Sequence, residues 1–214
     1  EKMEPLVEIK NLSIRFPEGN STFEAVKGIS FSIGKGEIVG VVGESGSGKS
    51  MSALALMGLL PKDAEIASGS LCFQGEDLVT MKPEKRRQLC GSKMAMVFQE
   101  PMTSLNPVLK IERQVGESLR IHTKLGNAEI HERVVQALSE VGLPDPEGLC
   151  GKYPHELSGG MRQRVMIAQA MINSPSLLIA DEPTTALDCV VQAQILELLR
   201  NIHRTKGTSI LFIS

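Results

Sequence analysis

The sequence predicts a layered α/β fold in which strands and helices alternate and a ligand binds at the carboxyl ends of the strands. Short apolar runs typical of strands lie at residues 38–42, 94–98 and 177–182, and amphipathic helical patterns separate them. A glycine-rich segment directly follows the first run, and two carboxylates end the third. We therefore expect these polar groups to lie along one edge of a parallel sheet.

The composition is that of an ordinary globular protein, with one domain and room for a subdomain. Of the 214 residues, 42% are hydrophobic and 22% are charged, and the net charge of −2 offers no basic face for nucleic acid. Aromatic residues make up only 3% of the chain, which argues against a base-stacking platform. No nucleic-acid partner is therefore expected.

The sequence contains no pattern typical of a membrane span or of secretion. No apolar run approaches the roughly 18 residues of a spanning helix, and the N-terminus lacks the charged-then-apolar pattern of a signal peptide. The cysteines and histidines match no metal-ligand spacing and no disulfide framework, so reduced thiols in the cytoplasm are expected. These residues are Cys72, Cys90, Cys150, Cys189, His122, His131, His155 and His203.

The N-terminal part of the chain predicts paired strands. Residues 6–16 alternate between apolar and polar side chains, and residues 23–33 are expected to return along them before a turn at 34–37. Phe16 ends the first strand, just before a turn cluster. An aromatic side chain there either stacks on an adenine ring or closes the core, and the residues alone favour the core.

The segment after residues 38–42 matches G-x-x-x-x-G-K-[ST], the pattern of a phosphate-binding loop. It comprises Gly43, Glu44, Ser45, Gly46, Ser47, Gly48, Lys49 and Ser50. The glycines let the backbone curve round a phosphate with its N–H groups pointing inward, and the helix predicted over 51–60 adds the partial positive charge of its N-terminus. Lys49 supplies a full charge to the outer phosphates, and the hydroxyl of Ser50 can bind Mg²⁺. The segment therefore predicts a nucleoside triphosphate pocket.

The middle of the chain changes character at a proline-bracketed loop. Strands are predicted over 66–75 and 94–98, with a helix at 83–89 between them, and Gln99 directly follows the second strand. Beyond residues 100–107 the pattern is helical to about residue 154, and Asn127 is the expected N-cap of its best-defined helix. We interpret this region as a helical insert.

A second candidate anion site opens the next helix. Ser158 is a natural N-cap, and Gly159 and Gly160 leave first-turn N–H groups uncovered, but no lysine is present. The next apolar strand ends in Asp181 and Glu182. With a phosphate loop upstream, Asp181 is suited to hold Mg²⁺ through water, and Glu182 to orient or deprotonate a water that attacks the γ-phosphate.

Taken in order, these motifs resemble the ATP-binding subunits of ABC transporters over nearly the whole chain. The set comprises G-E-S-G-S-G-K-S, Gln99 after an apolar strand, L-S-G-G-M, L-L-I-A-D-E-P and T-A-L-D. L-S-G-G-M followed by the D-E-P strand is more specific than the phosphate loop alone. The segments F-Q-E-P-M-T-S-L-N-P and Y-P-H-E-L-S-G-G-M-R-Q-R-V-M-I-A are similar to the oligopeptide, dipeptide and nickel importer branch.

The resemblance implies a P-loop NTPase (RecA-like) core with an N-terminal antiparallel β-subdomain and an inserted α-helical subdomain. A single ABC ATPase domain would span residues 1–214. Residues 1–99 would hold the β-subdomain and part of the nucleotide-binding core, 100–157 the helical subdomain, and 158–214 the signature helix and the rest of the core.

The resemblance also implies roles for the site residues. Glu182 would be the catalytic base, Ser50 and Asp181 would bind Mg²⁺, and Gln99 would sense Mg²⁺ and the attacking water. Phe16 would stack on the adenine of ATP, which reverses the preference drawn from the residues alone. In a head-to-tail pair, one subunit would bind the γ-phosphate of the ATP held by the other, and Asp188 would communicate between the two sites. The residues binding that γ-phosphate would be Ser158, Gly159 and Gly160.

The implied partners are a second ATP-binding subunit, identical or related, and two transmembrane permease subunits at the cytoplasmic face of the cell membrane. A substrate-binding protein would act through the permeases, and the cargo would be peptide or nickel. The family pattern continues past Ser214 with a histidine that contacts the γ-phosphate, so we expect the 214-residue chain to bind Mg-ATP and hydrolyse it slowly. Cys189 stands where close relatives have an aliphatic residue, and we expect it to be neutral.

Two other classes of function compete with this one. A soluble ABC-type mechanical ATPase acting on nucleic acid or ribosomes would share the motifs, but the sequence has no basic surplus and no second ATPase copy. A kinase or GTPase with a phosphate loop would leave L-S-G-G-M unexplained, and the guanine-selective N-K-x-D pattern is missing.

Overall fold

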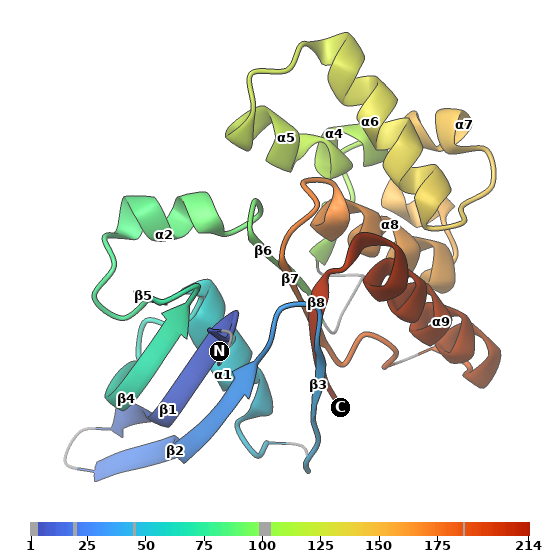
Figure 1. Ribbon diagram of the computed structural model, residues 1–214. Helices are drawn as coiled ribbons and strands as arrows, with labels where there is room; N and C mark the ends of the chain where they lie inside the picture. Colours follow the sequence, from blue (N-terminus) through green and yellow to red (C-terminus); the bar gives the residue numbers. More distant parts are fainter. Residues whose placement is uncertain (1–3, 19–20, 45, 99–103, 186) are drawn as a thin grey trace.

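The computed structural model describes residues 4–18, 21–44, 46–98, 104–185 and 187–214 (Figure 1). Two four-stranded sheets form its framework. The first is antiparallel, with the order β2-β1-β4-β5. Its strands are β1 (Val7–Glu18), β2 (Ser21–Ile33), β4 (Glu65–Phe73) and β5 (Glu76–Asp77).

The second sheet is parallel and has the order β3-β8-β7-β6. Its strands are β3 (Ile38–Val41), β6 (Met94–Val97), β7 (Leu177–Asp181) and β8 (Ser209–Ile213). Every residue of β6 and β7 is buried, as expected of parallel strands covered on both faces. The predicted α/β fold is thereby confirmed, including the strands that carry the phosphate loop and the two carboxylates.

The helices fall into two groups. Helices α1 (Lys49–Met57) and α2 (Pro83–Leu89) lie beside the antiparallel sheet, whereas the others gather beyond the parallel sheet (Figure 1). The second group comprises α4 (Ile111–Val115), α5 (Glu117–His122), α6 (Asn127–Glu140), α7 (Pro146–Cys150), α8 (Gly159–Met171) and α9 (Cys189–Lys206). A short 3₁₀ helix (Pro154–Glu156) precedes α8. Glycines with positive φ, Gly58 and Gly207, end α1 and α9.

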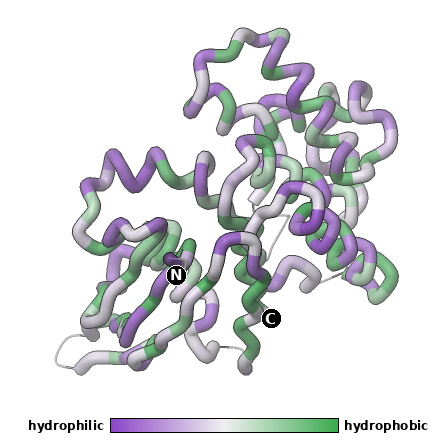
Figure 2. The backbone as a smooth tube through the Cα atoms, viewed as in Figure 1, coloured by the Kyte–Doolittle hydropathy of each residue, from purple (hydrophilic) through white to green (hydrophobic). Residues whose placement is uncertain are grey.

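The parallel sheet separates two hydrophobic cores, and hydrophobic residues follow its strands (Figure 2). In β7, Leu177 and Ile179 pack with the antiparallel sheet and α1, while Leu178 and Ala180 pack with the helices on the other side. Successive side chains of a strand point to opposite faces, so an unbroken apolar run can supply both cores at once. Because cores cover both faces of the sheet, the ends of its strands are held at a defined edge.

The start of α6 differs from the prediction. Asn127 is the first helical residue, and Gly126 occupies the N-cap position. The carboxylate of Glu129 accepts a hydrogen bond from the Gly126 N–H at 3.0 Å. Glu129 at the third helical position thus satisfies the N–H of the cap residue itself, and the predicted cap was wrong by one residue.

Candidate functional site

The phosphate loop connects β3 to α1, as its sequence pattern predicts. Gly48 is the N-cap of α1 with φ of 85°, and a Cβ at this position would lie 2.2 Å from the carbonyl oxygen of Ala25 on β2. Glycine is therefore required by both backbone conformation and space. The loop therefore packs closely against β2 where it leads into α1. Ser45 lies outside the described residues.

Two hydrogen bonds at the end of β8 tie the two halves of the site together. The N–H of Gly43 donates to the carbonyl of Ser214 at 3.3 Å, and the N–H of Glu182 donates to the carbonyl of Ile213 at 2.9 Å. The phosphate loop and the carboxylates therefore flank the end of one strand. This arrangement places the two motifs side by side although they are far apart in the chain.

The hydroxyl of Ser50 donates a hydrogen bond of 2.9 Å to Oδ1 of Asp181. Asp181 is buried, with 6% of its surface exposed, and this burial raises the pKa of its carboxyl despite the opposing effect of the Ser50 hydroxyl. A serine hydroxyl and a carboxylate are hard oxygen donors of the kind that Mg²⁺ prefers. The pair therefore fits a Mg²⁺ ion, with the carboxylate held where a cation would stabilise its charge.

Glu182 adopts an unusual backbone conformation, with φ of 43°. Such a conformation costs free energy in a residue other than glycine, and residues of this kind concentrate at functional sites. The hydroxyl of Thr185 donates to Oε2 of Glu182 at 3.1 Å. The half-buried carboxylate is thus oriented beside the buried one.

Lys49 folds over its own loop. Its Nζ donates to the carbonyl oxygens of Gly43 and Glu44 at 2.5 and 2.7 Å. The ammonium group thereby stands at the mouth of the loop, within the curve where a phosphate would bind. Gln99, predicted to contact Mg²⁺ and water, lies outside the described residues.

Phe16 was predicted to stack on the adenine of ATP, and the structure places a second aromatic side chain beside it. Phe16 and Phe23 face each other across the β1–β2 pair, with ring centroids 6.4 Å apart. Phe16 is half-buried. Phe23 is 57% exposed and lines a hollow of about 480 Å³ together with Ser47, Gly48 and Lys49. Phe23 was not predicted as a site residue, although its place opposite Phe16 in the predicted strand pair was the available signal.

The second candidate anion site lies at the start of α8. Ser158 is its N-cap and accepts a hydrogen bond of 3.3 Å from the Met161 N–H, as predicted from the sequence. A Cβ on Gly160 would lie 2.9 Å from Val191 on α9, so a glycine allows the two helix starts to approach. Asp188 caps α9 by accepting hydrogen bonds of 3.0 Å from the N–H groups of Val190 and Val191.

The structure therefore brings Ser158, Gly160 and Asp188 into one neighbourhood, formed by the first turns of α8 and α9. Among the described residues, no hydrogen bond joins this neighbourhood to the phosphate loop. The two candidate anion sites are thus separate features of the chain. Within the same described ranges, no helix combines the length and apolar character that crossing a membrane would require.

Comparison with known proteins identifies relatives over most of the chain. The model of the family described as ABC transporter matches residues 26–185. The chain is 50% identical to the peptidoglycan transport ATP-binding protein YejF of Agrobacterium fabrum, over 99% of this chain and 39% of the relative. It is 47% identical to the dipeptide transport ATP-binding protein DppD of Haemophilus influenzae, over 98% of this chain and 63% of the relative. The chain thus spans less than two thirds of the length of these relatives.

Solved structures give the same result for the fold. The ATP-binding cassette MJ0796, solved as a dimer in a post-hydrolysis state with ADP and Pi, matches with a TM-score of 0.86 at 27% identity. The match covers 97% of this chain and 87% of that one. The predicted fold of a P-loop NTPase with an ABC-type arrangement is confirmed.

We predict that Asp181→Asn raises the unfolding temperature of the nucleotide-free protein by a few degrees at neutral pH. Burial raises the pKa of Asp181, so the folded state binds its proton more tightly than the unfolded state does, and the ionised carboxyl costs stability above the raised pKa. The gain should shrink as the pH falls through the raised pKa and vanish below the ordinary value of 3.8, where both states are protonated.

Thermal denaturation followed by circular dichroism across this pH range measures the effect. Asp63→Asn, at an exposed position, is the matched control and should change the unfolding temperature little. A gain that is independent of pH, or a loss of stability at neutral pH, would contradict the assignment of the cost to a buried charge.

Proposed function

The chain belongs to the ABC transporter family, and on this basis we propose that it binds and hydrolyses ATP to power an importer of di- or oligopeptides. The observation that carries the proposal is the Ser50–Asp181 hydrogen bond of 2.9 Å beside the strained Glu182. Through this contact, the phosphate loop, the proposed magnesium-binding pair and a second carboxylate lie together at one edge of the sheet. The relatives named for dipeptide and peptidoglycan transport support the choice of cargo.

In the proposed reaction, the N–H groups of the loop and the N-terminus of α1 bind the phosphates of ATP. Lys49 leaves its carbonyl partners and pairs with the outer phosphates. Ser50 and Asp181 would hold Mg²⁺, and the bound ion would supply positive charge beside the γ-phosphate. Glu182 orients the attacking water and accepts its proton. In this proposal Gln99 contacts the same water and Mg²⁺.

The adenine ring is proposed to stack on the aromatic pair of the β1–β2 hairpin. Phe16 is the residue expected from the family resemblance, and Phe23 is the more exposed of the two and borders the hollow beside the loop. Stacking on one ring while the other supports it from behind would use both. The centroid distance of 6.4 Å fits such a supporting contact.

The separation of the two anion sites supports a dimer with composite sites. Ser158, Gly159 and Gly160 would bind the γ-phosphate of an ATP molecule held by the phosphate loop of a second subunit. Asp188, at the adjoining helix start, would lie near the same boundary and communicate between the two sites. The related cassette MJ0796, which was solved as a dimer, supports this arrangement.

Permease subunits are the proposed membrane partners, at the cytoplasmic face of the membrane. A groove of about 420 Å³ lies between β6, α5 and α8 and includes Phe98 and Met166. Phe98 directly precedes Gln99 in the chain, and we propose that the loop following Gln99 contacts the membrane subunits. In this scheme, ATP-driven closure of the dimer moves the helical region and thereby the permeases. A substrate-binding protein would deliver the cargo to the permeases.

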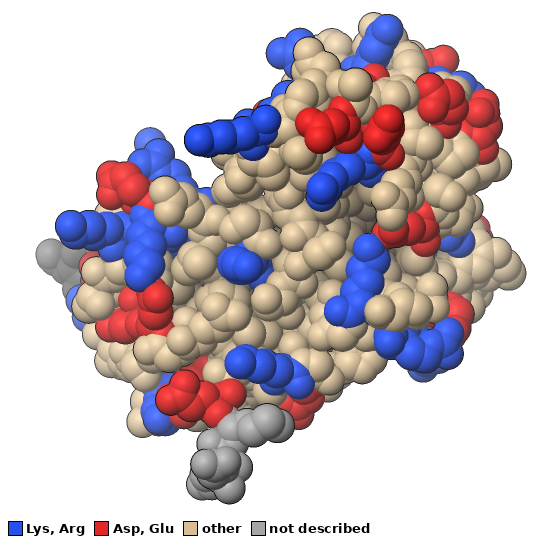
Figure 3. Space-filling view, turned by 45° about the horizontal axis from the view of Figure 1, so that its top comes forward, with Lys and Arg blue, Asp and Glu red and all other residues tan. Residues whose placement is uncertain are grey.

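A nickel or metal-chelate importer is the alternative within the same class. A mechanical ATPase acting on nucleic acid or ribosomes is the alternative from another class. Against the latter, Lys and Arg are interspersed with Asp and Glu over the face seen in Figure 3, and the net charge is −2. The described residues on that face form no continuous basic patch of the kind that phosphate backbones select.

We expect Glu182→Gln to bind ATP with unchanged affinity but to hydrolyse it at least about 100-fold more slowly, because the amide cannot accept the proton of the attacking water. The variant should also accumulate an ATP-bound dimer, seen by size-exclusion chromatography with light scattering. Glu197→Gln, an exposed change on α9, is the control that should leave turnover intact. Normal hydrolysis by Glu182→Gln would eliminate this residue as the base.

Composite sites can be tested by mixing two inactive variants, Lys49→Ala and Ser158→Arg. If each site uses the loop of one subunit and the α8 start of the other, half of the mixed population is heterodimeric and each heterodimer keeps one intact site. Hydrolysis should then recover to about a quarter of the native rate. No recovery in a mixture shown to contain heterodimers would mean that each site is completed within one chain.

The importer proposal predicts specific partners for the subunit at its full native length. Gentle extraction of the tagged subunit from membranes should recover two multi-span proteins and a second ATP-binding subunit. Ligand carried by the associated binding protein would distinguish peptide from nickel. Recovery with ribosomes or DNA-repair factors, and without multi-span proteins, would overturn the importer proposal but leave the ATPase chemistry untouched.

A further inference from the structure

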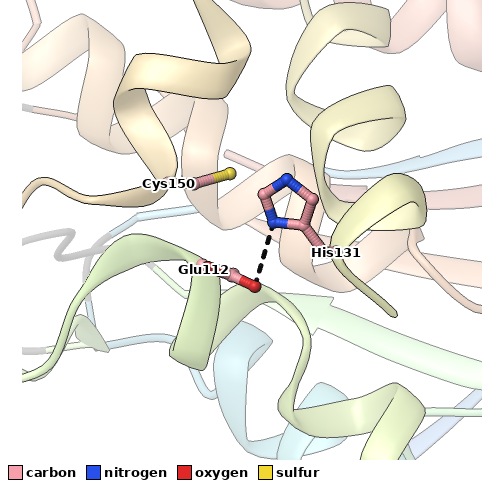
Figure 4. A group of neighbouring side chains, drawn as sticks. All are labelled: Glu112, His131 and Cys150. Carbon is pink, nitrogen blue, oxygen red and sulfur yellow. Dashed lines mark hydrogen bonds and ion pairs between the residues drawn. The ribbon is translucent and has the colours of Figure 1, made fainter. Parts of the chain in front are cut away.

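Three side chains with metal-binding atoms converge in the helical region, outside the nucleotide site. They are Glu112 on α4, His131 on α6 and Cys150 at the end of α7 (Figure 4). One such atom from each lies within 4.8 Å of those of the other two. Within the described ranges of the chain, this is the one group in which three His, Cys, Asp or Glu residues come so close.

We propose that Glu112, His131 and Cys150 bind a divalent transition-metal ion of the zinc class. Zn²⁺ binds carboxylate oxygen, imidazole nitrogen and thiolate sulfur at about 2.0–2.3 Å, which separates neighbouring ligand atoms by roughly 3.2–3.8 Å. Nδ1 of His131 is already 3.1 Å from Oε1 of Glu112. The Cys150 sulfur lies within 4.8 Å of a ligand atom of each of the other two residues, so an inward movement of this side chain completes a three-ligand site, with water in the fourth position.

A fourth residue supports the histidine as metal-ligating histidines usually require. Oε1 of Glu147 lies 2.9 Å from Nε2 of His131. When Nε2–H donates to this carboxylate, the lone pair of Nδ1 is free to face a metal ion beside Glu112. The carboxylate–histidine–metal arrangement fixes both the tautomer and the orientation of the ring.

The charges of the cluster suit an exchange of protons for a metal ion. Glu112 and Glu147 raise the pKa of His131, so the metal-free cluster favours an imidazolium between two carboxylates. Burial and the same two carboxylates raise the pKa of Cys150 to about 11, so its thiol is protonated and donates to the carbonyl of Pro146 at 3.4 Å. Binding one dication would release one proton from each residue and leave the net charge of the cluster unchanged.

A metal ion at this position would cross-link three short or medium-length helices. Helices α4 and α6 both pack on α8, which begins at Gly159 with Ser158 as its N-cap, and α7 packs on α4 and α6. The bound ion would therefore stiffen the packing around α8. This inference does not depend on the proposed ATPase function, because binding and stability report on it directly.

The test begins with chelator-treated protein titrated with Co²⁺, followed by competition with Zn²⁺. We expect one equivalent of Co²⁺ per chain to give a thiolate-to-cobalt charge-transfer absorption, and Zn²⁺ to displace it and raise the unfolding temperature. Cys150→Ser should abolish the absorption, because the thiolate that produces it is lost. Glu112→Gln should weaken Zn²⁺ binding by roughly tenfold or more, because it removes a direct ligand. Glu147→Gln should weaken it by about 10–100-fold, because it orients the histidine.

Cys189→Ser and Glu132→Gln are the matched controls, since one removes an exposed thiol and the other an exposed carboxylate on α6. Both should bind as the native chain does. If Cys150→Ser fails to fold, the two glutamate variants decide, because Glu147 is exposed and Glu112 is partly exposed. Native affinity in both glutamate variants, or an absorption that survives in Cys150→Ser, would overturn the proposal and leave the cluster as a proton-linked ion triad.

Discussion

Strand β8 forms hydrogen bonds with β3 along one side and with β7 along the other, and the position of the candidate site depends on this double pairing. Val41, Ile213 and Asp181 lie in one row across the three strands. The chain beyond Val41 becomes the phosphate loop, and the chain beyond Asp181 becomes the second carboxylate. Parallel strands end at a common edge. The phosphate loop and the two carboxylates therefore meet there, although more than half of the chain separates them in sequence.

The site itself opposes stability, and the cores on both sides of the sheet compensate for it. Glu182 has a left-handed backbone conformation, Asp181 is a buried carboxyl with a raised pKa, and Gly48 replaces any side chain where the loop meets β2. Each of these features is unfavourable in the empty protein, and each prepares a place for phosphate, cation or water. Such strain persists only where the surroundings over-determine it, and here β7 is buried along its whole length.

Local sequence patterns predicted the parts of this molecule that depend on neighbours in the chain. The fold class, the phosphate loop, the Ser158 cap and the strand that ends in Asp181 all follow from short segments with strong preferences. Prediction was weaker where geometry depends on contacts between segments. The exposure of Phe23 depends on the β1–β2 register, and the α6 cap depends on a carboxylate that folds back to Gly126. Glu112, His131 and Cys150 are evenly spread in sequence, so no ligand spacing could reveal a cluster that forms only when three helices pack.

The order of strands also constrains how the protein can be made. Within the part of the chain that the structure describes, strand β3 pairs only with β8, so its residues 38–41 have no sheet partner there until residues 209–213 have been synthesised. During translation, the antiparallel sheet can form early, but the phosphate loop must wait with an unpaired apolar strand behind it. Pairing of such high sequence separation is slow and leaves an exposed edge in the meantime. Until then the edge of β3 is open to pairing with other chains, and nucleotide can stabilise the phosphate loop only once β8 holds that loop beside the end of β7.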